Sequence, residues 1–196
     1  MSYNILITGG AGYLGSTMVP EFLADGHKVT VLDNFMFNQA SLNHCCFHPN
    51  FKIVKGDIRQ KNTMTQLMKS ADVIIPLAAL VGAPLCSLDP VGATTTNHDA
   101  IELMMSLLSQ DQIVLMPTTN SAYGTGDKDN FCTEESELCP ISQYAIEKVE
   151  IEKRLLNMPN SISFRLATVF GMSPRMRLDL LVNDFTYRAV YDRFVV

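Results

Sequence analysis

Two residues four positions apart, Tyr144 and Lys148, form the pattern in this chain that is best suited to catalysis. On a helix, side chains four apart lie on the same face. An ammonium group beside a phenol favours the phenolate, and it can lower the tyrosine pKa from about 10 toward neutral pH. Tyr144 could then act as a general base toward a hydroxyl group. Such pairs are also common on solvent-exposed helices, so the position of this pair in the fold decides between the two interpretations.

Thr119 is the second candidate. It follows the apolar run 113–116, which predicts a strand, so Thr119 lies near the carboxyl end of that strand. Open α/β sheets bind their ligands at this end. There Thr119 could share a substrate hydroxyl proton with Tyr144 while a nicotinamide takes the hydride from the same carbon. Considered alone, the Thr119 hydroxyl could equally cap a turn.

A glycine-rich turn supplies the candidate cofactor site. Gly9, Gly12 and Gly15 follow the apolar run 5–7 and precede an amphipathic segment, which predicts a strand, a tight turn and a helix. Glycine at these places lets the helix N-terminus approach a pyrophosphate closely. Asp33 ends the next predicted strand. Its carboxylate can accept hydrogen bonds from the adenine-ribose diol and would repel a 2′-phosphate, which predicts NAD rather than NADP.

Strand and helix patterns alternate along the chain. The predicted strands are 5–7, 28–33, 51–55, 72–75, 113–116 and 161–166, and the predicted helices are 12–24, 62–70, 89–109 and 142–157. Residues 175–196 predict one more helix and the start of a strand, and the polar residues 125–140 predict a solvated loop. This alternation favours parallel strands with right-handed crossovers. We therefore predict an α/β, Rossmann-like, doubly wound parallel sheet.

Composition excludes several classes of protein. The 196 residues are 47% hydrophobic and 18% charged, which is typical of a soluble globular domain. A net charge of −5 without basic clusters argues against nucleic-acid or anionic-membrane surfaces as partners. The N-terminus lacks a basic segment before its apolar run, so we expect no signal peptide and a cytoplasmic protein.

The five cysteines form no CxxC pair and predict free thiols. His44, Cys45, Cys46 and His48 lie close together in sequence, but no second ligand pair follows them. We therefore predict an ordinary loop there and no metal site.

The ordered motifs resemble those of the NAD-dependent epimerase/dehydratase family of extended short-chain dehydrogenases/reductases, enzymes that act on nucleotide sugars. The shared features are the turn TGGAGYLG at 8–15, Asp33, the segments 56–58, 77–79 and 118–124, Asn97, and the Tyr144–Lys148 pair. They occur in the family's order between residues 4 and 174.

The resemblance implies a role for each matching residue. Thr119, Tyr144 and Lys148 would be catalytic, and Lys148 would also bind the nicotinamide ribose. Asp57 and Ile58 would hold the adenine, and Asn97 would support the nicotinamide side. Read without the resemblance, Asp57 is a turn residue, Asn97 a buried polar residue and Lys148 a solvated charge. The full set implied to bind NAD is Gly9, Gly12, Tyr13, Leu14, Asp33, Asn34, Asp57, Ile58, Leu77, Ala78, Ala79, Asn97, Tyr144 and Lys148.

Departures from the family pattern narrow the expected reaction. Asn120 and Ser121 occupy the places where 4,6-dehydratases carry an Asp-Glu acid/base pair, so dehydration is not expected. Thr168 stands where many relatives carry a substrate-contacting asparagine, which argues against ordinary UDP-galactose 4-epimerase specificity. The sequences of residues 78–86 and 173–180 resemble those of a bacterial branch of this family that includes a GDP-heptose 4-dehydrogenase.

We expect residues 1–174 to form an NAD-binding domain with the catalytic residues, and 175–196 to begin a substrate-binding subdomain. Three functions remain open: epimerisation at C4 of a nucleotide sugar, net 4-dehydrogenation of one such as a GDP-heptose, and non-catalytic NAD binding. The resemblance also implies a homodimer through the helices in 91–109 and 142–157, although their periodicity would serve an internal core equally well.

Overall fold

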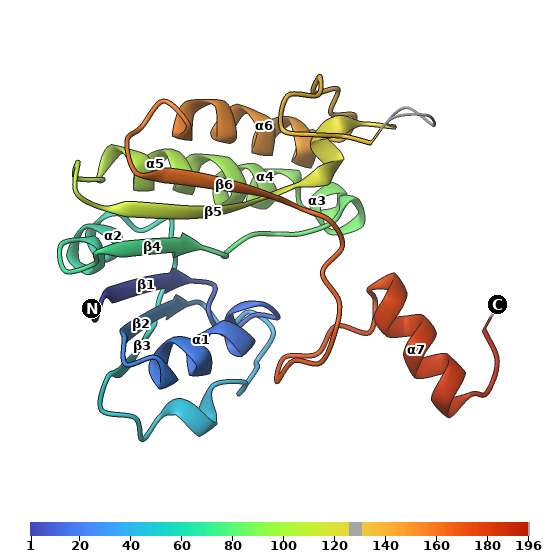
Figure 1. Ribbon diagram of the computed structural model, residues 1–196, viewed down its shortest axis with the longest axis horizontal. Coiled ribbons are helices and arrows are strands. Elements are labelled where there is room, and N and C mark those ends of the chain that lie inside the picture. Colours follow the sequence, from blue (N-terminus) through green and yellow to red (C-terminus); the bar gives the residue numbers. More distant parts are fainter. Residues whose placement is uncertain (126–130, 196) are drawn as a thin grey trace.

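The computed structural model describes residues 1–125 and 131–195. Six strands form one sheet in the order β3-β2-β1-β4-β5-β6, and every neighbouring pair is parallel (Figure 1). The strands are β1 (Asn4–Thr8), β2 (Lys28–Asp33), β3 (Phe51–Lys55), β4 (Val73–Pro76), β5 (Ile113–Thr119) and β6 (Ser161–Leu166). The strand order reverses at β1, as in Rossmann-like folds. The predicted fold class is confirmed.

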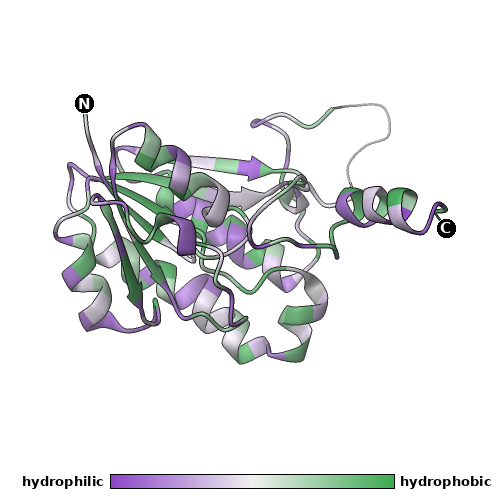
Figure 2. Ribbon diagram, turned by 90° about the horizontal axis from the view of Figure 1, so that it is seen from below, coloured by the Kyte–Doolittle hydropathy of each residue, from purple (hydrophilic) through white to green (hydrophobic). Residues whose placement is uncertain are grey.

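Apolar clusters on both faces of the sheet form the core, because alternate strand residues point to opposite faces. On one face, Ile7 and Val31 pack with Val19 and Leu23 of α1 (Gly15–Ala24). The other face carries a larger cluster, covered by α2 (Lys61–Met68), α5 (Ala100–Ser106) and α6 (Gln143–Leu155). Figure 2 shows the hydrophobic residues concentrated on these central strands.

The helix predicted over 89–109 is confirmed as a continuous helical segment, 90–106, although its middle is π-helical rather than α-helical. The chain forms α3 (Ala83–Leu88), α4 (Pro90–Thr94), the π-helical turn η2 (Thr95–Asp99) and then α5. Helix α3 was not predicted, and it is separated from α4 at Asp89, whose side chain caps α4 by accepting from the Gly92 N–H. Pro90 has no N–H to continue a helix from α3, so a new helix begins there.

A C-terminal lobe, residues 171–195, lies beside the α/β body rather than on the sheet (Figure 1). It contains α7 (Leu181–Tyr191), in which only Asn183 is buried. Residues 192–195 form no strand, so the predicted strand start is not found among the described residues. Figure 2 shows that α7 carries hydrophobic residues although it lies apart from the core.

Shorter segments complete the fold. The predicted loop 125–140 contains no helix or strand in its described part, 131–140, and Asp127 and Asp129 lie outside the described residues. Two short 3₁₀ helices, η1 (Asn43–Cys45) and η3 (Asn120–Tyr123), lie in connecting segments. Within the described ranges, no helix has the length and apolar character needed to cross a membrane. Nor do three or more His, Cys, Asp or Glu side chains gather there as a metal site.

Candidate active site

The glycine turn joins β1 to α1 at the carboxyl edge of the sheet. Gly9 has a φ of +68°, and its N–H donates to the Leu32 carbonyl at 2.7 Å. A Cβ on Gly9 would lie 2.5 Å from the backbone nitrogen of Ala78, and a Cβ on Gly15 would lie 2.5 Å from Gly10. Only glycine fits at these two positions, because backbone closes on both sides of the turn.

The residues that follow the turn fit a diphosphate. In the described part of the chain, the backbone N–H groups of Tyr13 and Leu14 have no protein acceptor. Leu14 precedes α1 without a side-chain cap. Free N–H groups together with the positive end of a helix dipole form an anion site. The turn therefore suits the pyrophosphate of a dinucleotide.

Asp33 lies next to this turn, where its carboxylate is buried. One carboxylate oxygen accepts from the Ala11 N–H at 3.0 Å, and the other accepts from the Phe35 N–H at 2.8 Å and from Gln39 Nε2 at 3.4 Å. A carboxylate can accept about four hydrogen bonds, so capacity remains for a ribose hydroxyl. Asn34 is exposed, and its side-chain oxygen accepts from the Met36 N–H.

Gln39, which contacts Asp33, is a further candidate cofactor-binding residue that was not predicted from the sequence. Its Oε1 is buried and has no hydrogen-bond partner within the described residues, while its Nε2 points to Asp33. Only its closeness to Asp33 in sequence could have suggested it.

The predicted adenine residues, Asp57 and Ile58, follow β3. The Asp57 carboxylate accepts from the Arg59 guanidinium at 2.6 Å, and this hydrogen bond lowers the pKa of Asp57. The Ile58 side chain is part of the core beneath α2. The Ile58 backbone is therefore the part of this residue that remains to face a ligand.

Residues 77–79 leave β4 beside the glycine turn, and Asn97 holds the residue that follows them. Asn97 Oδ1 accepts from the Leu80 N–H and Asn97 Nδ2 donates to the Leu80 carbonyl, both at 2.9 Å. Leu77, Ala78 and Ala79 are half-buried, whereas Asn97 is fully buried. The structure thus assigns Asn97 a buried structural role, and any effect on a nicotinamide would pass through this backbone.

Tyr144 and Lys148 share one face of α6, as predicted. The helix is capped by Ser142, whose Oγ accepts from the Ala145 N–H. Lys148 Nζ lies 5.9 Å from the centroid of the Tyr144 ring. Lys148 is only 4% exposed, so its interpretation as a solvated surface charge is wrong.

Burial controls the pKa values of this pair. Burial lowers the pKa of Lys148 to about 8, and the negative charges of Glu147 and Cys86 partly oppose this shift. The pKa of Tyr144 is raised, first by burial and then by Cys86, while Arg177 opposes the rise. The predicted lowering of the Tyr144 pKa is therefore not found, because burial disfavours the charged phenolate and the positive charge that opposes this is that of Arg177 rather than Lys148.

Thr119 ends β5 and also caps η3, since its Oγ1 accepts from the Ser121 N–H at 3.1 Å. The cap uses the oxygen as an acceptor and leaves the hydroxyl proton available to a ligand. Helix α6 packs against both β5 and η3, so Thr119 lies beside the helix that carries the pair.

A buried ion pair that the sequence did not suggest holds these elements together. Glu152 of α6 accepts from Arg165 Nε of β6 at 3.0 Å, and Glu152 also accepts from Ser163 Oγ. Thr118, adjacent to Thr119, donates to the Phe164 carbonyl. These contacts join α6, β5 and β6, the elements that carry or flank the catalytic candidates.

Two more titratable residues surround Lys148. Glu147 is buried and accepts from Thr94 Oγ1 at 2.6 Å and from Gln143 Nε2 at 3.1 Å. Cys86 Sγ donates to the Leu80 carbonyl at 3.3 Å. In the sequence, only the position of Glu147 beside Lys148 pointed to either of them.

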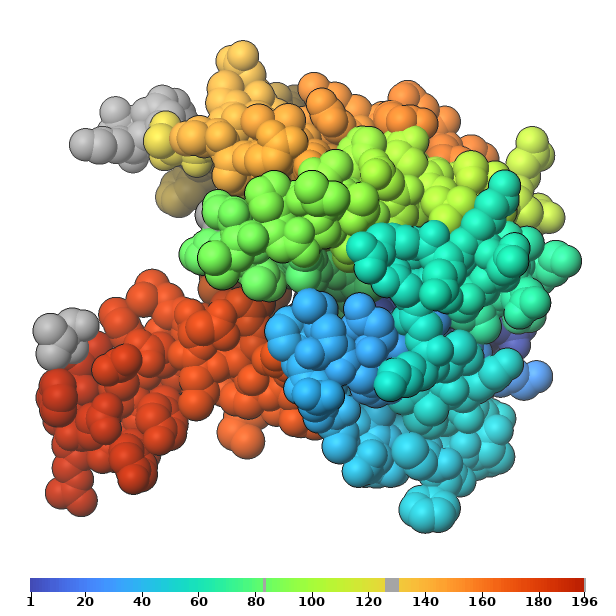
Figure 3. Space-filling view, turned by 180° about the vertical axis from the view of Figure 1, so that it is seen from behind, coloured from blue at the N-terminus to red at the C-terminus, as the bar shows by residue number. Residues whose placement is uncertain are grey.

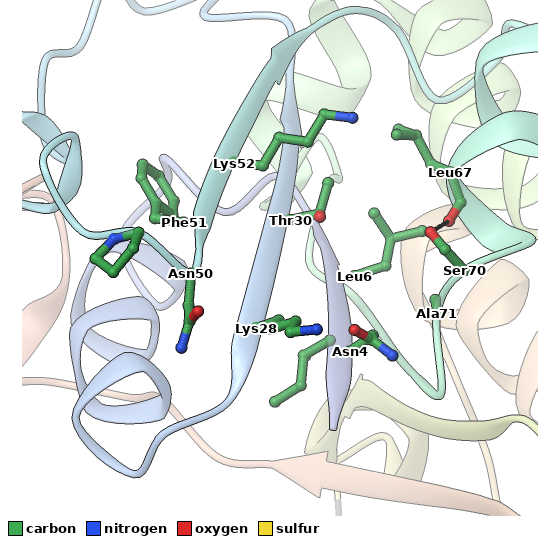
Figure 4. A pocket seen from close by; sticks show the side chains of 12 residues that line it. Asn4, Leu6, Lys28, Thr30, Asn50, Phe51, Lys52, Leu67, Ser70 and Ala71 are labelled. Atoms are coloured by element: carbon green, nitrogen blue, oxygen red, sulfur yellow. Dashed lines mark hydrogen bonds between the residues drawn. The ribbon is translucent and has the colours of Figure 1, made fainter. Parts of the chain in front are cut away.

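A separate pocket of about 230 Å³ lies at the opposite edge of the sheet (Figure 4). Its lining includes Asn4, Lys28 and Phe51, the first residues of β1, β2 and β3. Figure 4 shows the Lys52 side chain extending past Thr30. Because ligands of open α/β sheets bind at the carboxyl ends of strands, this pocket is not part of the candidate active site.

The sequence profile of the NAD dependent epimerase/dehydratase family matches residues 5–189. The chain belongs to this family. The predicted resemblance is therefore confirmed, and NAD, the predicted cofactor, is the one that the family description names.

Individual relatives agree with this result. The chain is 33% identical over 127 residues to the UDP-N-acetyl-alpha-D-glucosaminuronate decarboxylase of Bacillus cytotoxicus. The aligned residues make up 64% of this chain and 39% of that protein. Among solved structures, it matches the UDP-N-acetylglucosamine 4-epimerase of Methanobrevibacter ruminantium, in complex with UDP-N-acetylmuramic acid, with a TM-score of 0.85 and 24% identity over 97% of this chain and 64% of that one. It also matches the dTDP-glucose 4,6-dehydratase of Bacillus anthracis, in complex with NAD, with a TM-score of 0.83 and 24% identity over 97% and 62%.

The two structural matches support the fold. The chain spans less than two thirds of the length of each of the three proteins. The family contains epimerases, dehydratases and decarboxylases of nucleotide sugars.

Proposed function

We propose that this chain binds NAD at the carboxyl edge of its sheet and takes part in epimerisation at C4 of a nucleotide-activated sugar. The observation that carries the proposal is the buried Lys148 beneath the Tyr144 ring, on a helix packed against the strand end that bears Thr119. Burying a lysine to this degree costs folding free energy, and buried groups with strongly shifted pKa values are concentrated at functional sites.

Each residue has a distinct role in the proposed reaction. Tyr144 accepts the proton of the sugar hydroxyl, and Thr119 holds that hydroxyl by a hydrogen bond. Lys148 supplies positive charge to the phenolate and a hydrogen bond to the nicotinamide ribose. When bound, NAD would accept the hydride from the carbon that carries the hydroxyl and, in epimerisation, would return it to the opposite face of the resulting keto-sugar.

The pKa values define the expected pH range. Because the pKa of Tyr144 is raised, its phenolate forms at a higher pH than that of a solvent-exposed tyrosine. Lys148 loses its charge above a pH of about 8. We therefore expect kcat to rise with pH and then to fall once Lys148 is deprotonated.

The neighbouring structures support a nucleotide sugar as the substrate class, since the matched epimerase was solved with a UDP-sugar. Asn120 and Ser121 lack the acid/base groups that dehydration needs, so we propose a reaction that stops short of losing water.

A panel of nucleotide sugars incubated with the protein and NAD tests the proposal. NMR should detect a C4 epimer with no net NADH. If no sugar in the panel reacts while NAD binds normally, the alternative of a non-catalytic NAD-binding module replaces the proposal.

Net 4-dehydrogenation, for example of a GDP-heptose, is the second candidate. The resemblance of the sequences at 78–86 and 173–180 to the branch that includes a GDP-heptose 4-dehydrogenase favours it. It shares every catalytic residue with epimerisation, so only the products differ. Release of a keto-sugar with stoichiometric NADH would replace the epimerase with this dehydrogenase.

The predicted homodimer is also a proposal. Leu88 and Val91, beside the helices expected at the interface, are exposed large apolar residues. Sedimentation equilibrium should give twice the monomer mass, and a monomer at micromolar concentration would contradict it.

A further inference from the structure

The C-terminal lobe is attached to the glycine turn by a polar contact. Asn183 is 5% exposed, and it is the only buried residue of α7. Figure 3 shows the lobe (red) against the blue surface of the N-terminal segment, with an open notch between the lobe and the green and gold surface. The contact between lobe and body is therefore local.

Asn183, Tyr13 and Gly171 form a closed ring of hydrogen bonds. The Tyr13 hydroxyl donates to the Gly171 carbonyl at 2.6 Å and accepts from Asn183 Nδ2 at 3.0 Å. Asn183 Oδ1 in turn accepts from the Gly171 N–H at 2.8 Å. All three residues satisfy one another, so removing one leaves polar groups of the other two without partners.

Further bonds extend this ring on both sides. Ser173 Oγ donates to the Tyr13 carbonyl at 2.7 Å and lies 2.9 Å from Ser16 Oγ in α1. Asn183 Nδ2 also donates to the Arg177 carbonyl at 2.9 Å. Arg177 carries the positive charge that acts on Tyr144. The ring thus stands between the phosphate-binding turn and the residues that approach the proposed base.

The backbone and the side chain of Tyr13 have different contacts. Its backbone N–H, which has no acceptor among the described residues, belongs to the proposed phosphate site, while its side-chain hydroxyl bonds to the lobe. Any change in the position of Tyr13 therefore reaches both the cofactor and α7. We propose that Asn183 is a positioning residue that couples the binding of NAD at the glycine turn to the position of the C-terminal lobe.

This proposal rests on the proposed NAD site. By linkage, the coupling acts in both directions: NAD stabilises the lobe against local opening, and loss of the lobe contact weakens NAD binding by the same factor. Removing this hydrogen-bond ring is expected to weaken NAD binding about tenfold.

The test compares hydrogen exchange of the α7 amides with and without NAD, together with the Kd for NAD. In the wild type, NAD should slow exchange across α7. Asn183→Leu, which keeps the size and removes both polar atoms, should raise the Kd about tenfold and abolish this slowing. Thr186→Ala is the matched control, because Thr186 lies on the same helix and bonds only to the Val182 carbonyl.

A double-mutant cycle separates coupling from general damage. Tyr13→Phe removes the hydroxyl that Tyr13 contributes to the hydrogen-bond ring. It should raise the Kd for NAD and abolish the slowing of α7 exchange, as Asn183→Leu does. The double variant should be no worse than either single variant, because both break the same ring. Thermal unfolding of the body, followed by circular dichroism, should be unchanged, which verifies that each variant folds. If Asn183→Leu does not fold, Tyr13→Phe alone tests the proposal.

The outcomes are distinct. If the wild type binds NAD and both Asn183→Leu and Tyr13→Phe bind it with the same Kd, the coupling is overturned. It is also overturned if NAD does not change the exchange of the α7 amides. In either case the proposed NAD site is unaffected. Additive effects in the cycle also overturn the coupling. Absence of NAD binding in the wild type overturns both proposals together.

Discussion

The α/β body, residues 4–166, and the C-terminal lobe are held by different forces. The body buries apolar side chains on both faces of its sheet, whereas the lobe leaves Val190, Tyr191 and Phe194 exposed and buries only the polar Asn183. Apolar burial contributes about 25 cal/mol per Å², so the body is the stable unit. The body is therefore a well-packed α/β unit, whereas the lobe is attached to it by a small number of polar contacts.

The proposed functional residues follow the same division. Thr119, Tyr144 and Lys148 all lie on elements of the body, and the glycine turn lies at its centre. The lobe approaches this site through Tyr13 and Arg177. Changes in the body should therefore affect chemistry, cofactor and stability, while changes in the lobe should act mildly.

Tyr144→Phe should have the largest effect. It removes the proposed base, so kcat should fall by at least about 10³-fold while the Kd for NAD stays within about twofold. Tyr191→Phe, an exposed tyrosine of the lobe, is the control and should keep normal turnover. A Tyr144→Phe variant that retains activity would end the assignment of Tyr144 as the base.

Gly9→Ala should abolish NAD binding. The new methyl group would meet the Ala78 backbone at 2.5 Å, at a φ of +68°. Gly26→Ala is the matched control: Gly26 also has a positive φ, +83°, but open space surrounds its Cβ position. That variant should lose only about 1 kcal/mol of unfolding free energy, in contrast to several for Gly9→Ala, as urea denaturation can measure. Equal losses would show that backbone strain alone, rather than the closed turn, requires glycine.

Lys148→Met should stabilise the fold while abolishing turnover. The folded pKa of Lys148, about 8, lies below the ordinary value of 10.5. Below pH 8 the group is charged in both states and the burial cost is fully present, amounting to about 3 kcal/mol. As pH rises from 8 to 10.5 the unfolded state binds more protons, so wild-type stability rises and the advantage of the variant disappears. Urea melts at pH 7 and pH 10.5 measure both points, and an advantage that does not shrink with pH would contradict this account.

The smallest effect separates the two regions by packing alone. Val31→Ala, in the fully buried core, should lose about 2 kcal/mol of unfolding free energy. Val190→Ala, at a side chain that is 77% exposed, should change it by less than about 0.5 kcal/mol. If the two losses were similar, the lobe would be packed in solution and the comparison would fail.

The sequence predicted the body well because its signals are local. The glycine spacing, the strand patterns and Tyr144–Lys148 each depend on residues close together in the chain, and the structure places them as predicted. Helix α3 (Ala83–Leu88) and the π-helical turn η2 were not predicted. Helix α3 spans fewer than two turns and carries no apolar periodicity long enough to reveal it.

Contacts between distant residues could not be predicted. Tyr13 and Asn183 are 170 residues apart, and neither pattern suggests the other. The roles of Asn97 and the raised pKa of Tyr144 likewise depend on burial, which a motif does not report. Sequence therefore predicted which residues form the candidate site, and the structure supplied what surrounds them.

The most direct test of the account is to denature the purified protein and identify any released nucleotide by mass spectrometry, before and after incubation with NAD and desalting. The account predicts NAD or NADH in equal amount to the chain, and its loss in Gly9→Ala. Protein that releases no dinucleotide even after incubation would contradict the claim that the glycine turn and Asp33 form a working cofactor site.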